Sequence, residues 1–257
     1  MLRGDWNAGA TYLGIKGGAN DACRHAHYDL GSFVLDADGV RWAVDLGPDD
    51  YHLPYYFDPA ARSRYYRTST LGHNTIVIDG RSQPPTGRAF IVHRQFERSL
   101  SRVVLDMTLA YPGCTRSLRG FALIDGRHVV IVDEITPGRP LASVVWQMHT
   151  TAKIEPRGGS VTLVETLAGA GPARLFMRIV EPKGRVFTTA TATPSGPVGQ
   201  NPNRGISKVV VDLGQMEAEA PFRLTVILSP DETACASLDP AGVIARPVDE
   251  WNGALRQ

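Results

Sequence analysis

The frequency of glycine and proline along the sequence limits most strongly what this chain can fold into. The 257 residues include 26 glycines and 18 prolines, and both residue types interrupt helices. Between them lie short segments rich in valine, isoleucine, threonine and aromatic residues, which is typical of β-strands. We therefore predict an all-β fold, a large antiparallel sandwich of two sheets with few short helices.

The expected strands are distributed along the chain from residue 11 to residue 228. Their ranges are 11–15, 31–36, 41–45, 74–78, 101–109, 117–123, 128–135, 144–149, 160–165, 173–180, 206–213 and 222–228. The length allows a single sandwich domain over residues 1–257, or one with a smaller β subregion beginning at about residue 160. Two long loops are expected, the aromatic and arginine-rich segment 48–70 and the segment 193–205, which we expect to be mobile.

Charge and cysteine content exclude several classes of protein. Lys and Arg number 27 against 26 for Asp and Glu, so the chain lacks the basic field that holds nucleic acid. Cys23, Cys114 and Cys235 are far apart and indicate neither a disulfide framework nor a thiolate metal site. We find no membrane-spanning segment and, within residues 1–20, no apolar export signal.

Histidine and aspartate residues gather in the first third of the chain. They form the pattern His25-x-His27-x-Asp29, followed by Asp45 and His73. If this segment is a strand, His25 and His27 project from one face and can share one centre. Two imidazole nitrogens and a carboxylate oxygen suit zinc better than calcium or magnesium.

Each of these residues also has an ordinary structural interpretation. Histidines in a strand are more often surface or hydrogen-bonded groups than metal ligands. Asp45, before Leu46 and Gly47, could cap a turn, and His73 could do the same after Gly72.

The motifs resemble one known family. The run YLGIKGGANDACRHAHYDLGSFVLDADGVRWAVDLGPDDYHLPYYF, followed by RYYRTSTLGHNTIVIDG, resembles the start of the C-terminal β-sandwich domain of heparinase II/III-like polysaccharide lyases, a group that includes related alginate lyases. The resemblance is densest over residues 12–80 and weaker through RGFALIDGRHVVIVDEI and VVWQMHT. These lyases place an α/α toroid of helices before the sandwich. The chain starts almost at the sandwich, so we expect its toroid partner to be missing or separate.

The resemblance implies a role for each motif residue. His27, Asp45 and His73 match the family's zinc ligands, and this zinc is expected to brace the sandwich rather than to activate water. His25 matches a histidine beside the substrate cleft. It would handle a proton or neutralise a carboxylate.

The loop after Asp45 supplies the other expected site residues. Tyr56 matches a cleft tyrosine and is the second catalytic candidate, with Tyr55 as its close rival. Arg67 could bind substrate carboxylates or sulfates through a bidentate contact. Aromatic packing and a solvated loop face are the alternatives for these side chains.

The implied reaction is β-elimination at a uronic acid. The sugar carboxylate must be neutralised, the proton on the neighbouring carbon removed, and the departing glycosidic oxygen protonated. Histidine and tyrosine can do this. The principal catalytic tyrosine would lie on the helical domain, so we expect little turnover from this chain alone.

Three function classes remain open at this point. The first is the sandwich part of a lyase that acts on an acidic polysaccharide. The second is a non-catalytic carbohydrate-binding or structural module that keeps the zinc. A cupin-type metal enzyme is weaker, because no glutamate follows His27 at the expected spacing. The substrate class implies a periplasmic or secreted location, and an apolar sandwich face could lead to homo-oligomers.

Overall fold

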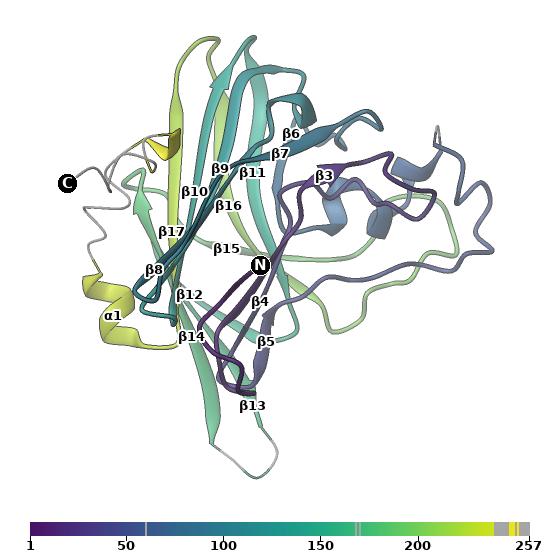
Figure 1. Cartoon of the computed structure of the whole chain (residues 1–257). Coiled ribbons are helices and arrows are strands. Elements are labelled where there is room, and N and C mark those ends of the chain that lie inside the picture. Colours follow the sequence, from purple (N-terminus) through teal and green to yellow (C-terminus); the bar gives the residue numbers. More distant parts are fainter. Residues whose placement is uncertain (60, 168, 170, 239–246, 250, 252–257) are drawn as a thin grey trace.

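The computed structural model describes residues 1–257 except 60, 168, 170, 239–246, 250 and 252–257. Strands dominate this part of the chain (Figure 1), and its one α-helix is the short α1 (Glu232–Ser237). The predicted all-β sandwich is confirmed. No helix among the described residues is long and apolar enough to cross a membrane. Cys23, Cys114 and Cys235 are free.

One layer of the sandwich is a large antiparallel sheet. Within the described residues its order is β12-β13-β14-β17-β10-β9-β8-β7-β3. In that order the strands are Lys153–Arg157, Ser160–Thr166, Pro172–Glu181, Phe222–Ser229, His128–Pro137, Cys114–Ile124, Leu100–Asp106, Arg88–Phe96 and Gly18–Ala19. Of the strands that begin at residue 160 or later, β13, β14 and β17 belong to this sheet together with the earlier strands.

The opposite layer is divided between two smaller antiparallel sheets, where we had expected one. Among the described residues, one has the order β1-β2-β4-β5 and the other β15-β16-β11-β6. Their strands are Leu2–Arg3, Tyr12–Ile15, Phe33–Ala37 and Val40–Ala43, then Thr188–Thr191, Ser207–Met216, Leu141–Thr150 and Ile76–Ile78. The two sheets meet where the Val44 N–H, just after β5, donates to the His149 carbonyl of β11 at 3.0 Å.

The main core lies between the two layers. Phe33 of β4 contacts Phe121 of the large sheet and Trp146 of β11, with ring centroids 6.1 and 6.3 Å apart. One aromatic side chain thus joins all three sheets. Burial of such rings is among the largest apolar contributions to folding.

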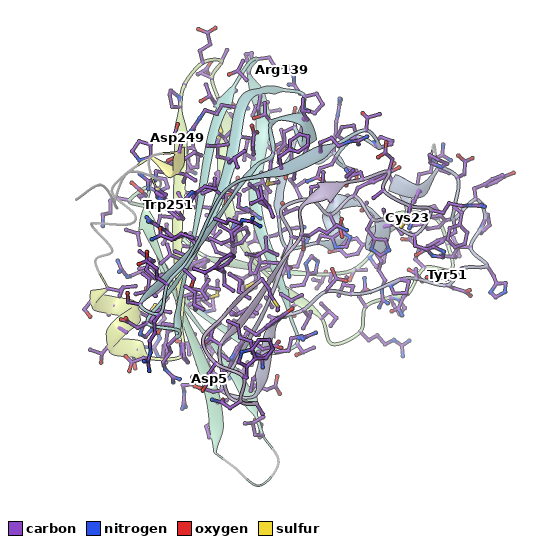
Figure 2. The ribbon with its side chains drawn as sticks, viewed as in Figure 1. Asp5, Cys23, Tyr51, Arg139, Asp249 and Trp251 are labelled. Carbon is purple, nitrogen blue, oxygen red and sulfur yellow. The ribbon has the colours of Figure 1, made fainter. Side chains whose placement is uncertain are left out.

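The outer face of the large sheet is covered by the C-terminal region. Trp251 and Val248 pack there on alternate residues of the sheet such as Val130 and Val132. Gly120 is required under this cover, because a Cβ at that position would lie 2.8 Å from the Trp251 ring. Figure 2 shows Trp251 on this side, away from the loops that carry Cys23 and Tyr51.

The two long loops project from the same side of the sandwich (Figure 1). Residues 193–205, expected to be mobile, are held against residues 48–70. The Tyr66 N–H donates to Gln200 Oε1 at 2.6 Å. This contact helps to close the region that contains the predicted site residues.

Candidate metal centre

Three separate segments deliver the predicted metal ligands. His27 lies in the loop between β3 and β4, Asp45 follows β5, and His73 precedes β6. The β4–β5 hairpin turns at Asp38 and Gly39, whose positive φ angles of 52° and 78° are typical of a type I′ turn. The hairpin returns the chain so that Asp45 lies near the loop that precedes β4.

Asn74 holds these segments together. Its side-chain amide donates to the carbonyls of Phe33 and Val44 at 2.7 and 2.9 Å, and its Oδ1 accepts from the His149 N–H at 2.7 Å. One buried amide therefore connects the start of β4, the end of β5 and strand β11, directly beside His73. Asn74 directly follows His73 in the sequence, and residue type and spacing alone do not predict this role.

The structure brings His27, Asp45 and His73 together. His73 Nδ1 lies 3.1 Å from Asp45 Oδ2, and the rings of His27 and His73 have centroids 5.3 Å apart. Two ligand atoms on a tetrahedral zinc, each about 2.0 Å from the metal, lie about 3.3 Å apart. In the described part of the chain, however, no three His, Cys, Asp or Glu side chains have the arrangement of a formed metal site. Side-chain rotations would be needed to complete one.

The electrostatics of the group suit a cation. Burial, together with nearby His73, lowers the pKa of His27 to about 4, so its ring is neutral at pH 7, as a metal ligand must be. Burial by itself would lower the pKa of His73, but its hydrogen bond to Asp45 and the charge of that carboxylate raise it. Although burial opposes it, contact with His73 holds the pKa of Asp45 well below its usual range.

The two ring nitrogens of His73 have different surroundings. His73 Nε2 is buried and has no well-aligned hydrogen-bond partner, although the backbone of Arg67 interacts with the ring and also raises its pKa. An unpaired polar atom in a protein interior is costly. The donor chemistry and the His73–Asp45 contact therefore fit zinc.

Asp29 is a further acidic group beside this cluster. Its side chain is 14% exposed, with Lys16 Nζ 3.8 Å from Oδ1, and Oδ1 has no hydrogen-bond partner. Burial raises the pKa of Asp29, while the charges of His73 and Lys16 act in the opposite direction. Asp29 is the last residue of the His25-x-His27-x-Asp29 pattern.

His25 lies apart from the metal ligands. The prediction that His25 and His27 share one strand face is wrong, because neither belongs to a strand. The Ala26 N–H donates to the Cys23 carbonyl in a turn, which separates the two rings. His25 is exposed and packs against Tyr51.

The two tyrosine candidates differ sharply in exposure. Tyr56 is 1% exposed, accepts the Asp49 N–H at 3.0 Å and has its pKa raised by burial. Tyr55 is 75% exposed, with an unusual positive φ of 58°. Tyr56 would have to leave its cluster to reach a substrate. Its ring joins Tyr51, Tyr65 and Phe57, with centroids 5.1 to 5.6 Å away.

Arg67 connects the two long loops. Its Nε donates to Asn203 Oδ1 at 2.8 Å and its Nη1 donates to the Pro48 carbonyl at 2.9 Å. The guanidinium is thus partly occupied by protein acceptors. Its predicted role in binding substrate stays a prediction.

Residues 5–197 match the family described as Heparinase II/III-like, C-terminal. The chain belongs to this family. No curated protein sequence matches the chain significantly.

Solved structures share the fold. A heparinase III gene product superposes with a TM-score of 0.71 at 18% identity, covering 89% of this chain and 34% of that one. Heparan sulfate lyase HepC from Pedobacter heparinus gives a TM-score of 0.70 at 15% identity, covering 88% and 34%. Identities this low show a common fold alone. The chain spans about a third of the length of these structures.

Proposed function

We propose that this chain is the sandwich part of a lyase that cleaves a uronic-acid-containing polysaccharide by β-elimination. In this proposal it supplies half of the active site, and a toroidal helical domain supplies the other half. Family membership supports the reaction class. The gathering of His27, Asp45 and His73 from three segments, with exposed His25 nearby in sequence, is the observation that carries the proposal.

The three ligands would hold a structural zinc. A bound zinc would cross-link the loops that carry His27, Asp45 and His73 and so stiffen the side of the sandwich that faces the substrate. Asn74 would hold the same segments from beneath. No step of the reaction needs to pass through the metal.

His25 would act directly on the sugar. Elimination removes the proton from the carbon next to the uronate carboxylate, breaks the neighbouring carbon–oxygen bond and leaves a double bond in the ring, while the departing oxygen takes a proton. Because His25 is exposed, its ring can reach a bound chain and pair with the carboxylate or move the proton. Its edge contact with Phe57, with centroids 5.2 Å apart, would orient it.

Metal analysis tests the zinc. The purified chain is expected to contain one zinc per molecule by elemental analysis, and His27→Ala and His73→Ala are expected to lose it. His52→Ala is the matched control, because the His52 side chain is 96% exposed. A parent chain without stoichiometric zinc would remove the zinc brace from the proposal.

The reaction is tested separately. Joined to a helical lyase domain, the chain is expected to produce unsaturated uronate, seen as growing ultraviolet absorbance, and His25→Ala is expected to abolish it while keeping the zinc. Equal turnover in the parent and in His25→Ala would exclude His25 as a catalytic group. Binding of the polysaccharide without any turnover would favour the non-catalytic module.

The substrate class also bears on location. A polysaccharide is too large to enter a cell intact, so we place the protein in the periplasm or outside the cell. Detection of the protein only in the cytoplasmic fraction would contradict this.

A further inference from the structure

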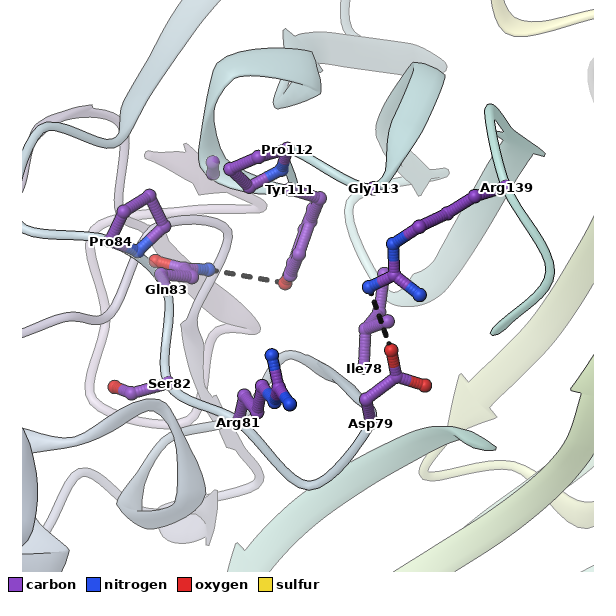
Figure 3. Close-up of a pocket in the computed structure, with 11 residues that line it drawn as sticks. Ile78, Asp79, Arg81, Ser82, Gln83, Pro84, Tyr111, Pro112, Gly113 and Arg139 are labelled. Carbon is purple, nitrogen blue, oxygen red and sulfur yellow. Dashed lines mark hydrogen bonds and ion pairs between the residues drawn. The ribbon is translucent and has the colours of Figure 1, made fainter. Parts of the chain in front are cut away.

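A cavity of about 270 Å³ opens beside the end of β6, lined by residues that the proposed reaction does not use. Figure 3 shows its walls, which combine apolar surfaces with a few polar groups. Ile78, Ala110 and Pro112 contribute apolar atoms, and Pro84 and the largely buried Tyr111 complete the lining. Mostly apolar concave sites with a few placed polar groups are the usual form of small-ligand sites.

Most polar groups of the cavity are already occupied. The Tyr111 hydroxyl donates to the Ile76 carbonyl at 2.7 Å and accepts from Gln83 Nε2 at 3.1 Å. Ser82 Oγ accepts the Thr70 N–H at 3.0 Å. These groups form a fixed floor rather than a set of free hydrogen-bonding partners.

Arg139 lines the opposite side of the cavity, and protein acceptors hold its guanidinium in place. Its Nη2 donates to Asp79 Oδ2 at 2.8 Å and its Nη1 donates to the Pro140 carbonyl at 2.9 Å. A Cβ on Gly113 would lie 3.1 Å from Arg139 Nη2, so the guanidinium rests on the Gly113 backbone. Asp79 largely neutralises the charge of Arg139.

Arg81 differs from every other charged group of this cavity. Its side chain makes no hydrogen bond or ion pair with any described residue. Figure 3 shows its guanidinium directed into the space bounded by Tyr111, Asp79 and Arg139. The cavity therefore holds one uncompensated positive charge with five potential donors.

The backbone presents Arg81 in a defined position. Asp79 and Gly80 have φ angles of 54° and 64°, which form a type I′ turn, closed by the Arg81 N–H donating to the Ile78 carbonyl at 3.0 Å. Asp79 Oδ1 also accepts from the Ala142 N–H at 2.8 Å. The turn is thus anchored to β11, and little backbone ordering would be needed on binding.

We propose that this cavity is a second saccharide subsite, in which Arg81 binds an anionic group of an acidic sugar and Tyr111 and Pro84 pack against the sugar ring. The anionic group is a sulfate ester or a uronate carboxylate, since both accept two parallel hydrogen bonds from a guanidinium. The substrate class rests on the proposed function, but the subsite does not involve His25 or the metal ligands. The segment between His73 and Arg81 connects the two sites.

Calorimetric titration with defined oligosaccharides tests this proposal and separates the two anions. The parent chain is titrated with an unsulfated uronate tetrasaccharide and with its sulfated counterpart at fixed salt, because contacts between charges weaken with salt. Arg81→Gln is expected to lower the affinity for the oligosaccharide at least tenfold, and Arg81→Lys is expected to lower it by a smaller factor. Arg94→Gln, an exposed arginine of β7 outside the cavity, removes the same charge and is expected to leave the affinity unchanged.

Each outcome has a definite meaning. If Arg81→Gln lowers the affinity for the sulfated tetrasaccharide alone, Arg81 binds the sulfate. If it lowers the affinity for both tetrasaccharides, Arg81 binds the carboxylate. No measurable binding by the parent, or equal weakening by Arg81→Gln and Arg94→Gln, would overturn the subsite. Zinc content measured on Arg81→Gln distinguishes this result from a failure of the zinc brace, since that variant is expected to keep its metal.

Discussion

Arg119 in β9 and Asp133 in β10 form a buried, two-pronged ion pair inside the sandwich. Arg119 Nε and Nη2 donate to the two carboxylate oxygens of Asp133 at 2.6 and 3.0 Å. The remaining Nη1 donates to the carbonyls of Gly31 and Asn74 at 2.8 and 3.2 Å. The large sheet is thereby tied to two segments, one following His27 and the other following His73.

Removal of this arginine is expected to be severely destabilising. Arg119→Met leaves the Asp133 carboxylate buried without its partner, which costs about 3–5 kcal/mol of the free energy of unfolding. Urea denaturation followed by tryptophan fluorescence measures the loss. Arg41→Met is the control, because Arg41 and Asp36 form an exposed pair whose loss costs less than about 1 kcal/mol. Similar losses in both variants would show that Arg119 has no special structural role.

Gly72 controls the position of His73. A Cβ at Gly72 would lie 2.4 Å from the Tyr66 carbonyl oxygen, and backbone atoms cannot yield as a flexible side chain can. Gly72→Ala is expected to cost about 1–3 kcal/mol and to weaken metal binding by displacing His73. Thermal unfolding and zinc titration measure the two effects. At Gly171 a Cβ meets nothing within 4 Å, so Gly171→Ala should change neither quantity.

His149 is expected to make stability depend on pH. It lies inside β11, where Tyr66 Oη is 2.8 Å from its Nε2, and burial lowers its pKa to about 3. An unfolded histidine has a pKa of about 6.5, so between these values the unfolded state binds the additional proton. The contribution of His149 to the free energy of unfolding is therefore complete above about pH 7, and it falls by a few kcal/mol as the pH approaches 3.

The contribution of His149 is isolated by comparing variants. His149→Gln is expected to be less stable than the parent at pH 8 and to lose stability less steeply between pH 7 and pH 4. His52→Gln, changed at an exposed histidine, should follow the parent curve. Parallel curves for the parent and His149→Gln in chemical denaturation would contradict the expectation.

Metal removal is expected to lower thermal stability, if the zinc brace is correct. A ligand that binds only the folded state at about a hundred times its Kd adds about 2.7 kcal/mol, which corresponds to about 5–10 °C for a chain of this size. Scanning calorimetry before and after chelation, followed by zinc addition, measures this difference. His27→Ala should show no response to the chelator. A parent chain that is equally indifferent would argue against a structural metal.

The fold could be predicted from short-range patterns, but much of the site could not. Alternating residues around Asp38 and Gly39 indicate the β4–β5 hairpin, because strand and turn preferences are local. The same local pattern predicts a strand for His25 and His27, but the structure has a turn at His25 and irregular backbone at His27. The local propensity of a segment does not indicate which loop will pack over it.

Contacts between distant residues explain what was missed. Tyr56 is buried because the rings of Tyr51 and Tyr65 pack against it. Asn74 connects three strands because its amide hydrogen-bonds to the backbone near one end of each. Arg81 is exceptional only because its neighbours in space have other partners. None of these relationships follows from residue type or spacing.

The docking of residues 193–205 on the 48–70 loop bears on the order in which the chain folds. Tyr66 and Gln200 are 134 positions apart, and Asp49 accepts the Asn201 N–H across 152 positions. Closing such long loops is entropically costly and slow. The loop contacts should therefore form only after β11 and β16 have paired. A growing chain that does not yet include Asn201 would already carry His27, Asp45 and His73. It would lack the contact between Asn201 and Asp49, so the loop side of these three residues would stay open.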